Sequence, residues 1–242
     1  MRPYRFADSF SNDKSMLFDG VNEFLNVGND TSLDVDYNTA YSWSLWFNAS
    51  TLDSASELLF RKYVAPKICT LNLLNNTMQF DLYNTTGNRL TKIWTFSNSN
   101  TATWYHVVIT KAASSAASGL KMYLDSVEDA SPTTTIDTLG TANTVSTADF
   151  CIGADSAGSS GFNGYIDEVS FWDKELSSAE VSEIYNSGCP DDLNNHSASG
   201  NIVSWWKMGD GDTISSITDQ IGSNTGTPNN MEGADITTTT VC

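Results

Sequence analysis

Short apolar and aromatic runs with a period of two are the feature that most constrains the fold of this chain. In residues 41–47, Trp43, Leu45 and Phe47 occupy every second position, so one set of side chains lies on each face of a strand. Similar runs, each bounded by turn residues, cover residues 15–20, 23–27, 57–62, 68–74, 78–83, 104–110, 121–125, 150–153 and 165–172. This regular spacing predicts an all-β fold in which two antiparallel sheets form a sandwich.

One short helix is predicted after these strands. Ser177 can accept a hydrogen bond from the backbone of Glu180, whose side chain can reach back in a capping box. Val181 and Ile184 form an apolar stripe, and Gly188 ends the pattern. We expect a helix of about ten residues that packs on the edge of the sandwich.

The balance of charge excludes several classes of partner. The chain has 29 acidic and 12 basic residues, which gives a formal net charge of −17. Nucleic acid and anionic membranes require a basic face, so neither is an expected partner. No run approaches the ~20 apolar residues of a membrane span, and no signal peptide is visible. We therefore expect no membrane insertion.

Four segments in a fixed order carry a family resemblance. They are residues 17–24 (Leu-Phe-Asp-Gly-Val-Asn-Glu-Phe), residues 41–47, the pair 103–108 and 122–126, and residues 162–169 followed by Trp172 and residues 176–181. Together they resemble the laminin-G-like, concanavalin A-like lectin/glucanase superfamily, with Ser126 at a position where glycine is usual. The resemblance implies a jelly-roll sandwich over residues 15–188.

The tail, residues 189–242, departs from that pattern. Residues 203–210 and the turns at 219–227 resemble the strand that usually opens these domains, yet here they follow the closing helix. The two ends of such a fold meet at the surface, so moving this strand need not break the core. We expect a circularly permuted sandwich in which residues 201–227 pair near residues 16–18 and 165–172. The alternative is the start of a second, truncated repeat.

No pattern of catalytic residues is visible. Glucanases of the superfamily that this chain resembles use strands of the form E-x-D-x-x-E or E-x-D-x-E, and this chain has neither pattern. Asp167 and Glu168 are adjacent, so an ordinary strand would place them on opposite faces. His106 lies in a strand of the resemblance, where packing is expected, and His196 lies in a polar loop. The chain is therefore predicted not to be an enzyme.

Aspartates in glycine-rich turns make calcium the one candidate cofactor. Asp210, Asp212 and Asp219 lie at the end of, or after, the segment that resembles the opening strand, and the permutation would bring Asp19 near them. Calcium prefers such oxygen ligands, although aspartate also favours turns for its own backbone hydrogen bonds. No cofactor is required by the sequence.

The four cysteines lack the spacing of a zinc site. Cys69 and Cys151 lie in expected strands and are predicted to be buried. For Cys189 and Cys242, a disulfide that ties down the tail and a pair of free thiols both remain open.

Aromatic residues outside the four segments are candidates for glycan binding, because ring faces stack on sugar C–H groups and polar neighbours fix the orientation. The alternative is that each ring packs in the core or at the rim. The candidate glycan-binding residues are Tyr63, Tyr83, Trp94, Asn84 and Arg89, with Arg61 and Asn72 able to assist.

Residues 1–14 precede the resemblance and combine cations with aromatic rings on an acidic protein. They are predicted to form an assembly arm that docks onto a partner or a neighbouring subunit; the alternative is an ordinary flanking strand. The residues concerned are Arg2, Tyr4, Arg5, Phe6 and Phe10.

Residues 17–24 and the tail together resemble virion surface proteins of marine tailed phages. This resemblance implies a non-catalytic tail fibre, spike or capsid decoration that is assembled in the host cytoplasm and contacts host glycans or receptors from the virion surface. Its partners would be other virion proteins and copies of itself, for example in a trimer. The alternative is an extracellular carbohydrate-binding accessory module of a secreted adhesin or glycanase.

Overall fold

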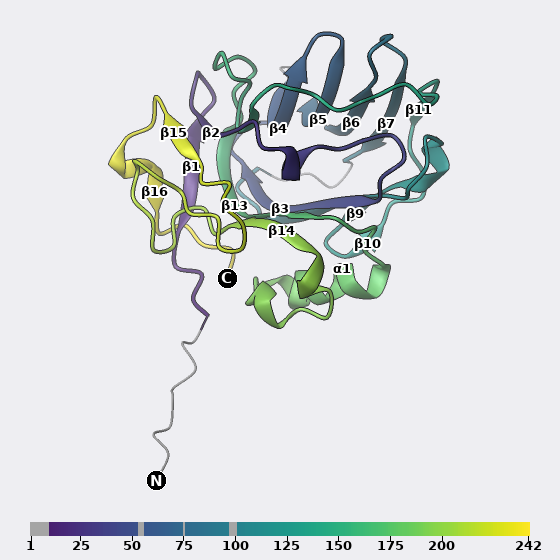
Figure 1. The fold of residues 1–242 in the computed structure, drawn as a ribbon. Coiled ribbons are helices and arrows are strands. Elements are labelled where there is room, and N and C mark those ends of the chain that lie inside the picture. Colours follow the sequence, from purple (N-terminus) through teal and green to yellow (C-terminus); the bar gives the residue numbers. More distant parts are fainter. Residues whose placement is uncertain (1–9, 53–55, 75, 97–100) are drawn as a thin grey trace.

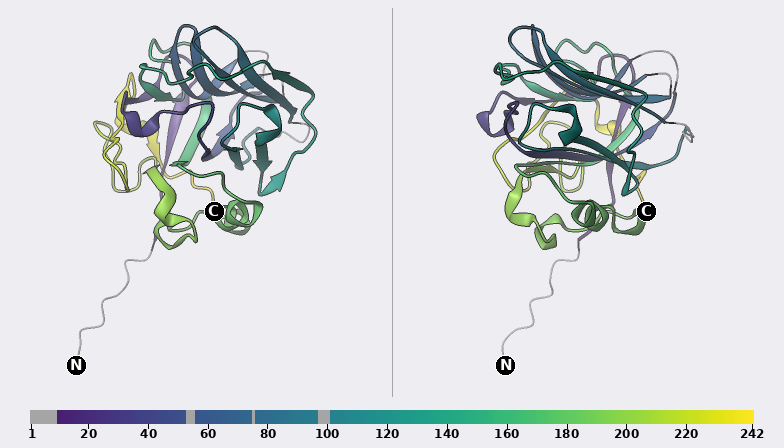
Figure 2. Two further views of the ribbon diagram at one scale, coloured as in Figure 1. Left: turned by 45° about the vertical axis from the view of Figure 1, so that its right-hand side comes forward. Right: turned by 90° about the vertical axis from the view of Figure 1, so that its right-hand side faces the viewer.

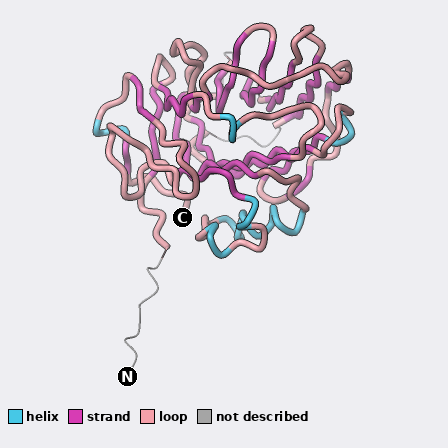
Figure 3. The backbone as a smooth tube through the Cα atoms, viewed as in Figure 1, coloured by secondary structure: helices cyan, strands magenta, loops and turns pink. Residues whose placement is uncertain are grey.

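The alternating runs fold into two antiparallel sheets of eight strands each, packed face to face (Figure 1). The computed structural model describes residues 10–52, 56–74, 76–96 and 101–242. This architecture confirms the predicted all-β sandwich. Strands fill both layers, whereas helical segments lie at the periphery (Figure 3).

The first sheet, sheet A, has the strand order β10-β9-β8-β3-β13-β1-β16, and β14 also pairs with β13. Its strands are β1 (Ser15–Asp19), β3 (Tyr41–Ala49), β8 (Tyr105–Lys111), β9 (Leu120–Leu124), β10 (Val127–Glu128), β13 (Asn163–Trp172), β14 (Ile202–Trp206) and β16 (Ile236–Thr237).

The second sheet, sheet B, has the order β11-β7-β6-β5-β4-β12-β2-β15. Its strands are β2 (Phe24–Gly28), β4 (Glu57–Val64), β5 (Lys67–Leu74), β6 (Thr77–Tyr83), β7 (Arg89–Thr95), β11 (Thr134–Asp137), β12 (Phe150–Ile152) and β15 (Thr227–Asn229).

Aromatic rings from both sheets meet in the core between them. The ring centroid of Trp43 lies 4.2 Å from that of Phe171, 4.5 Å from Phe150 and 5.0 Å from Phe60. All four side chains are buried. Burying a large apolar side chain contributes about 1.5–3 kcal/mol, so this cluster is a main source of the attraction between the layers.

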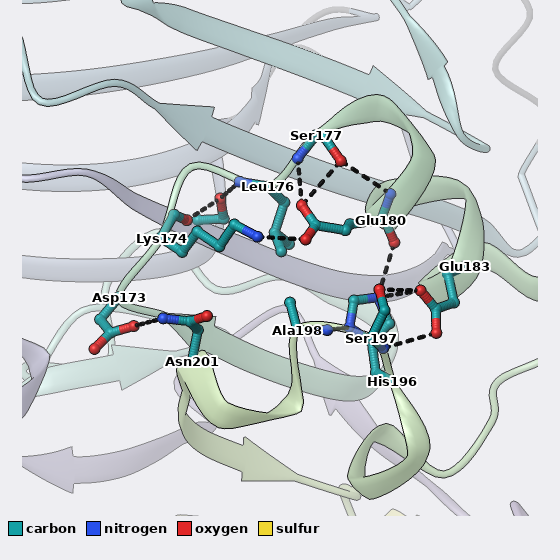
Figure 4. A network of polar contacts seen from close by, with 11 residues as sticks. Asp173, Lys174, Leu176, Ser177, Glu180, Glu183, His196, Ser197, Ala198 and Asn201 are labelled. Carbon is teal, nitrogen blue, oxygen red and sulfur yellow. Dashed lines mark hydrogen bonds and ion pairs between the residues drawn. The ribbon is translucent and has the colours of Figure 1, made fainter.

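The predicted capping box starts the helix α1 (Ser178–Tyr185). Ser177 accepts from the backbone N–H of Glu180, and the Glu180 side chain accepts from the backbone of Ser177 (Figure 4). Lys174 forms an ion pair with Glu180 beside this cap. The remaining helical segments are 3₁₀ turns: η1 (Thr31–Leu33), η2 (Ala117–Gly119), η3 (Asn186–Gly188), η4 (Leu193–Asn195), η5 (Ser199–Asn201) and η6 (Gly233–Asp235).

The helix covers the outer face of sheet A, so the prediction that it packs on the edge is wrong (Figures 1 and 2). Val181 and Ile184 pack in one buried cluster with Val108, Tyr123 and Trp172, which point away from sheet B. An apolar outer face needs a cover, and the segment after β13 supplies it. Within the described parts of the chain, no helix is long and apolar enough to cross a membrane.

The C-terminal segment joins the same sandwich. Strand β14 pairs with residues 169–172 of β13, while β1 pairs with residues 163–166 of the same strand. Strand β16 pairs with β1, and β15 pairs with β2. The expected pairing of the tail with β13 is therefore present. Circular permutation concerns the ancestry of this strand order and stays a prediction, as do the boundaries at residues 14 and 188.

Candidate functional site

Polar side chains form a row across four strands on the outward face of sheet B, where Thr70, Asp81 and Thr91 are nearly buried. Arg61, Thr70, Asp81 and Thr91 are register partners on β4, β5, β6 and β7. Each of the four has at least one apolar chain neighbour in the core, so the alternation of a strand directs these four outward. Asp81 accepts hydrogen bonds from Thr91 at 2.5 Å and from Gln79 at 2.6 Å, so its carboxylate is held within the sheet.

A second row lies next to the first, toward the end of the sheet. Tyr63, Ile68, Tyr83 and Arg89 are consecutive register partners on the same four strands. We call these four residues the tyrosine–arginine row. Strands in a sheet are about 4.8 Å apart, so the two tyrosines, which stand two strands apart, are separated by roughly 10 Å.

Each tyrosine of this row is paired with an arginine. The guanidinium carbon of Arg61 lies 4.2 Å from the ring centroid of Tyr63, and that of Arg89 lies 5.4 Å from the centroid of Tyr83. Arg89 Nη1 also donates to the Tyr83 hydroxyl at 2.5 Å. Tyr63 remains 42% exposed. Stacking on arginine orients each ring while leaving surface for a ligand.

A cavity of about 350 Å³ opens beside Tyr63. We call it the Tyr63 cavity; it is lined by Arg61, Tyr63, Val64, Ala65, Asp149, Asp155, Ser156 and Ala157. Arg61 Nη1 lies 3.6 Å from Asp155 Oδ2, so the cavity contains a paired cation and anion. Its volume is within the ~300–1,000 Å³ of small-molecule sites.

Two loop contacts shape this cavity. Asp155 Oδ1 accepts from the backbone N–H groups of Ala157 at 2.9 Å and Ser159 at 2.8 Å, which fixes the loop between β12 and β13. Asp149 Oδ2 accepts from Asn26 Nδ2 at 3.0 Å, and Asp149 also lines a neighbouring polar hollow along β2 and β15. Sequence reasoning did not assign either aspartate to a glycan site. The Gly/Ser-rich loop after residue 153 was the only available signal.

The structure brings Tyr63, Tyr83 and Arg89 together, but the prediction for Trp94 is wrong. Trp94 is fully buried, and its Nε1 donates to the carbonyl of Asp129 at 3.1 Å. It shares the inward face of β7 with Leu90, because the two positions differ by four residues. A ring in the core cannot stack on a sugar.

Asn84 is also misassigned as a ligand contact. Its side chain is 1% exposed and holds the turn between β6 and β7. Asn84 Oδ1 accepts from the backbone of Thr86 at 2.9 Å and of Asn88 at 3.1 Å, and Nδ2 donates to the carbonyl of Leu139 at 2.5 Å. Asn84 therefore positions the two ends of the hairpin, Tyr83 and Arg89, without reaching the ligand surface.

The four aspartates proposed for calcium are not gathered at one site. Asp219 accepts four backbone hydrogen bonds, from residues 205, 221, 222 and 224, and Asp210 accepts from the backbone of Asp13. Asp212 accepts from the backbone of Thr218, and Asp19 from that of Val21. No group of three or more His, Cys, Asp or Glu side chains that could hold a metal occurs in the described ranges. Asp19, Asp212 and Asp219 instead stabilise local turns, and Asp210 binds the backbone of the N-terminal segment.

Asp167 and Glu168 lie close together, contrary to the expectation of opposite faces. A register shift interrupts the pairing of β13 with β3 at this point, and Glu168 has a φ of +49°. This bulge turns both carboxylates toward Asn12, which donates to each of them. Burial, followed by the neighbouring negative charge, raises the pKa of Asp167 well above its usual range, and burial raises the pKa of Glu168 to about 7.

Both histidines have structural partners. His106 is fully buried, its Nε2 lies 2.8 Å from Ser44 Oγ, and burial lowers its pKa to about 3. His196 is 5% exposed, and its Nε2 lies 3.0 Å from the carbonyl of Glu180 at the helix (Figure 4). Neither ring lies in the Tyr63 cavity.

The described part of the predicted arm docks on its own chain. Phe10 stacks on Trp205 with ring centroids 6.2 Å apart, and Lys207 Nζ lies 4.7 Å from the Phe10 centroid. Arg2, Tyr4, Arg5 and Phe6 lie outside the described residues. A role of the arm in assembly therefore stays a prediction.

All four cysteines are free thiols in this structure. Cys69 and Cys151 are buried, as expected. Burial, together with a contact from the thiol of Cys189, raises the pKa of Cys242 to about 11. The two C-terminal thiols are therefore neighbours, and whether they form a disulfide stays a prediction.

The two antiparallel sheets packed face to face define a protein of the jelly-roll β-sandwich class. A family model described as the concanavalin A-like lectin/glucanases superfamily matches residues 19–182. The chain belongs to this superfamily. No curated protein sequence matches it significantly.

Solved structures share the fold at low sequence identity. A putative carbohydrate-binding protein from Bacteroides ovatus ATCC 8483 superposes with a TM-score of 0.59 at 14% identity, covering 90% of this chain and 58% of that one. The binding domain of Paraclostridial Mosquitocidal Protein 1 gives 0.52 at 13% identity, covering 73% and 52%. The botulinum neurotoxin serotype D binding domain gives 0.52 at 16%, covering 80% and 56%. This chain thus matches little more than half the length of each of these structures.

Proposed function

We propose that this chain is a non-catalytic carbohydrate-binding domain whose ligand lies along the tyrosine–arginine row and enters the Tyr63 cavity. The observation that carries the proposal is the register that places Tyr63, Tyr83 and Arg89 in one row beside that cavity. An exposed ring offers a face to sugar C–H groups, and the guanidinium and carboxylate groups next to it can bind hydroxyls.

The partners of the carboxylates near this face support binding over catalysis. A retaining or inverting glycosidase needs two carboxyl groups that flank the bond to be cleaved. Asp149 and Asp155 both line the cavity, but each already has partners. Asp149 accepts a hydrogen bond from Asn26, whereas Asp155 pairs with Arg61 and accepts from the loop backbone. The closely spaced pair, Asp167 and Glu168, is buried in sheet A.

The wider role that we propose is a virion surface protein, either a tail fibre, a spike or a capsid decoration. It is supported by the resemblance of residues 17–24 and of the tail to such proteins, and by a net charge of −17 that favours solubility on a crowded particle. Its partners would be other virion proteins, further copies of this chain and a host glycan. The alternative is an accessory module of a secreted adhesin or glycanase. This alternative is favoured by the match of the chain to little more than half the length of longer binding proteins.

Glycan-array binding of the full chain, compared with a Tyr63→Ala variant, tests the binding proposal. We expect binding that the substitution weakens by about tenfold or more, since ring stacking on a ligand commonly contributes over 1 kcal/mol. Tyr165→Ala is the control, because that half-buried tyrosine lies in sheet A. Equal binding by the wild type and Tyr63→Ala would refute the assigned site.

A separate experiment tests the virion context. Antibody against this chain, applied to purified particles from a host culture that makes the protein, should label the particle exterior in electron micrographs. Labelling confined to the culture medium would favour the accessory-module alternative. Light scattering of the purified chain measures the subunit number, for which a trimer is the proposal.

A further inference from the structure

We propose that the tyrosine–arginine row selects acidic oligosaccharides: Arg89 binds an anionic group of one sugar while Tyr63 stacks on an uncharged ring further along the chain. This inference rests on the proposed carbohydrate-binding function and names the class of glycan. It follows from a difference in charge between the pairs Arg61–Tyr63 and Arg89–Tyr83, which have a similar cation–ring geometry.

The first pair is already neutralised. Arg61 lies over Tyr63 and forms an ion pair with Asp155 at 3.6 Å, and Asp149 lines the same cavity. A ligand anion at this position would meet two carboxylates. The Tyr63 end of the row is therefore suited to an uncharged sugar whose hydroxyls bind these groups.

The second pair is not neutralised. Arg89 donates to the Tyr83 hydroxyl, and within the described ranges no carboxylate lies within ion-pair distance of its guanidinium. Asp81, the acidic residue in the adjacent row of the same face, is held by Thr91 and Gln79. A guanidinium has five N–H donors in a planar fork, so four remain for a ligand.

Such a cation is unusual on this protein. Only 12 basic residues oppose 29 acidic ones, and two of the lysines, Lys62 and Lys111, are buried with partners of their own. Arg89 therefore places a positive charge in the row of a protein that otherwise repels anions, and a planar carboxylate or a sulfate can bind the guanidinium fork in bidentate geometry.

The spacing adds a length requirement. Tyr63 and Arg89 stand three strands apart, which is roughly 14 Å at about 4.8 Å per strand. One sugar ring cannot contact both ends. The ligand must therefore be an oligosaccharide with its anionic group several bonds away from the ring that stacks on Tyr63.

Binding of the full chain to matched probes tests this inference. The probes are an oligogalacturonate hexamer, the same hexamer as its uncharged methyl ester, and a sulfated cello-oligosaccharide with its unsulfated parent, within an array of other acidic glycans and their neutral counterparts. We expect at least one acidic member to bind about tenfold or more tightly than its neutral counterpart, with an affinity that falls as salt is added. The carboxylate and sulfate arms distinguish the two sources of the charge.

Variants of Arg89 test whether this residue causes the preference for acidic glycans. Arg89→Gln should weaken the acidic ligand about tenfold or more while leaving the neutral counterpart unchanged, and Arg89→Lys should restore part of the affinity because it keeps the charge but loses the fork. Lys121→Gln on sheet A removes the same charge elsewhere and should have no effect.

The outcomes separate this inference from the proposed function. If glycans bind and Tyr63→Ala weakens them, but acidic and neutral probes bind equally or Arg89→Gln changes nothing, the acidic preference is refuted and the carbohydrate-binding site stands. If no glycan in the array binds, or Tyr63→Ala has no effect, the proposed function fails and the acidic preference fails with it.

Discussion

Asn12 donates through its single Nδ2 to two carboxylates at once, 2.9 Å from Asp167 Oδ2 and 3.1 Å from Glu168 Oε1. Glu168 also accepts from Trp205 Nε1 at 2.5 Å. The contact joins the N-terminal segment, the bulge of β13 and the C-terminal strand β14 at one buried position. It ties the N-terminal segment to two neighbouring strands of sheet A.

Replacing Asn12 by alanine should destabilise the protein. Asn12→Ala leaves two buried carboxylates without a shared donor, which costs about 1–3 kcal/mol by the usual penalty for an unsatisfied buried group. Urea unfolding measures the change in free energy. Ser11→Ala, one residue away and exposed, is the control. Equal stability of Asn12→Ala and the wild type would show that the amide contributes nothing.

The same pair predicts a dependence of stability on pH. Burial raises the folded pKa of Glu168 from its ordinary 4.5 to about 7, and raises that of Asp167 as well. The folded state thus keeps protons that the unfolded chain has released, so this contribution is complete below pH 4.5 and is lost as the pH rises through about 7. Glu168→Gln should lose less stability than the wild type between pH 5 and pH 8, measured by thermal unfolding. Parallel curves for the two proteins would contradict the raised pKa.

The burial of His106 predicts that the protein loses stability in acid, which is opposite to the trend expected from Glu168. Its folded pKa is lowered from 6.5 to about 3 by burial, so the unfolded chain binds a proton that the folded protein does not. Stability should therefore fall as the pH decreases from 6.5 toward 3. His106→Gln keeps a polar group that can bind Ser44 but cannot titrate. Its stability should change less than that of the wild type over this range; the same slope in both proteins would be inconsistent with a buried neutral His106.

Trp94 should govern stability rather than ligand binding. The ring is fully buried in the core, and truncation of such a residue costs about 3–5 kcal/mol. We expect Trp94→Ala to lower the melting temperature strongly. Tyr63→Ala, at an exposed position, should leave the melting temperature nearly unchanged. The reverse pattern would show that the inward and outward faces of sheet B are misassigned.

A substitution at Asp219 tests whether this aspartate stabilises the backbone or binds a metal ion. Its carboxylate accepts the backbone N–H groups of Trp205, Ile221, Gly222 and Asn224. Asp219→Asn replaces one acceptor oxygen by a donor and should cost about 1–3 kcal/mol. Neither added calcium nor a chelator should move the melting temperature of the wild type. A rise with calcium that Asp219→Asn abolishes would restore the metal site.

Local patterns in the sequence were sufficient to predict much of the fold. The period of two in residues 41–47 and the turn clusters predicted the strands, and Ser177 with Glu180 predicted the helix start. The four family segments predicted the two-sheet sandwich. The strand and helix signals depend on contacts between near neighbours in the chain, and so they can be recognised without coordinates.

The candidate site was predicted only in part, because it depends on pairing between distant strands. Alternation places Trp94 and Arg89, five positions apart, on opposite faces of β7, but it does not show which of the two faces is buried. The bulge that brings Asp167 and Glu168 together also has no local signal. The sequence by itself determined the strands, the helix cap and the superfamily. Only the tertiary structure decided that Tyr63, Tyr83 and Arg89 stand in one row, since cross-strand register is set by the packing of the whole sandwich.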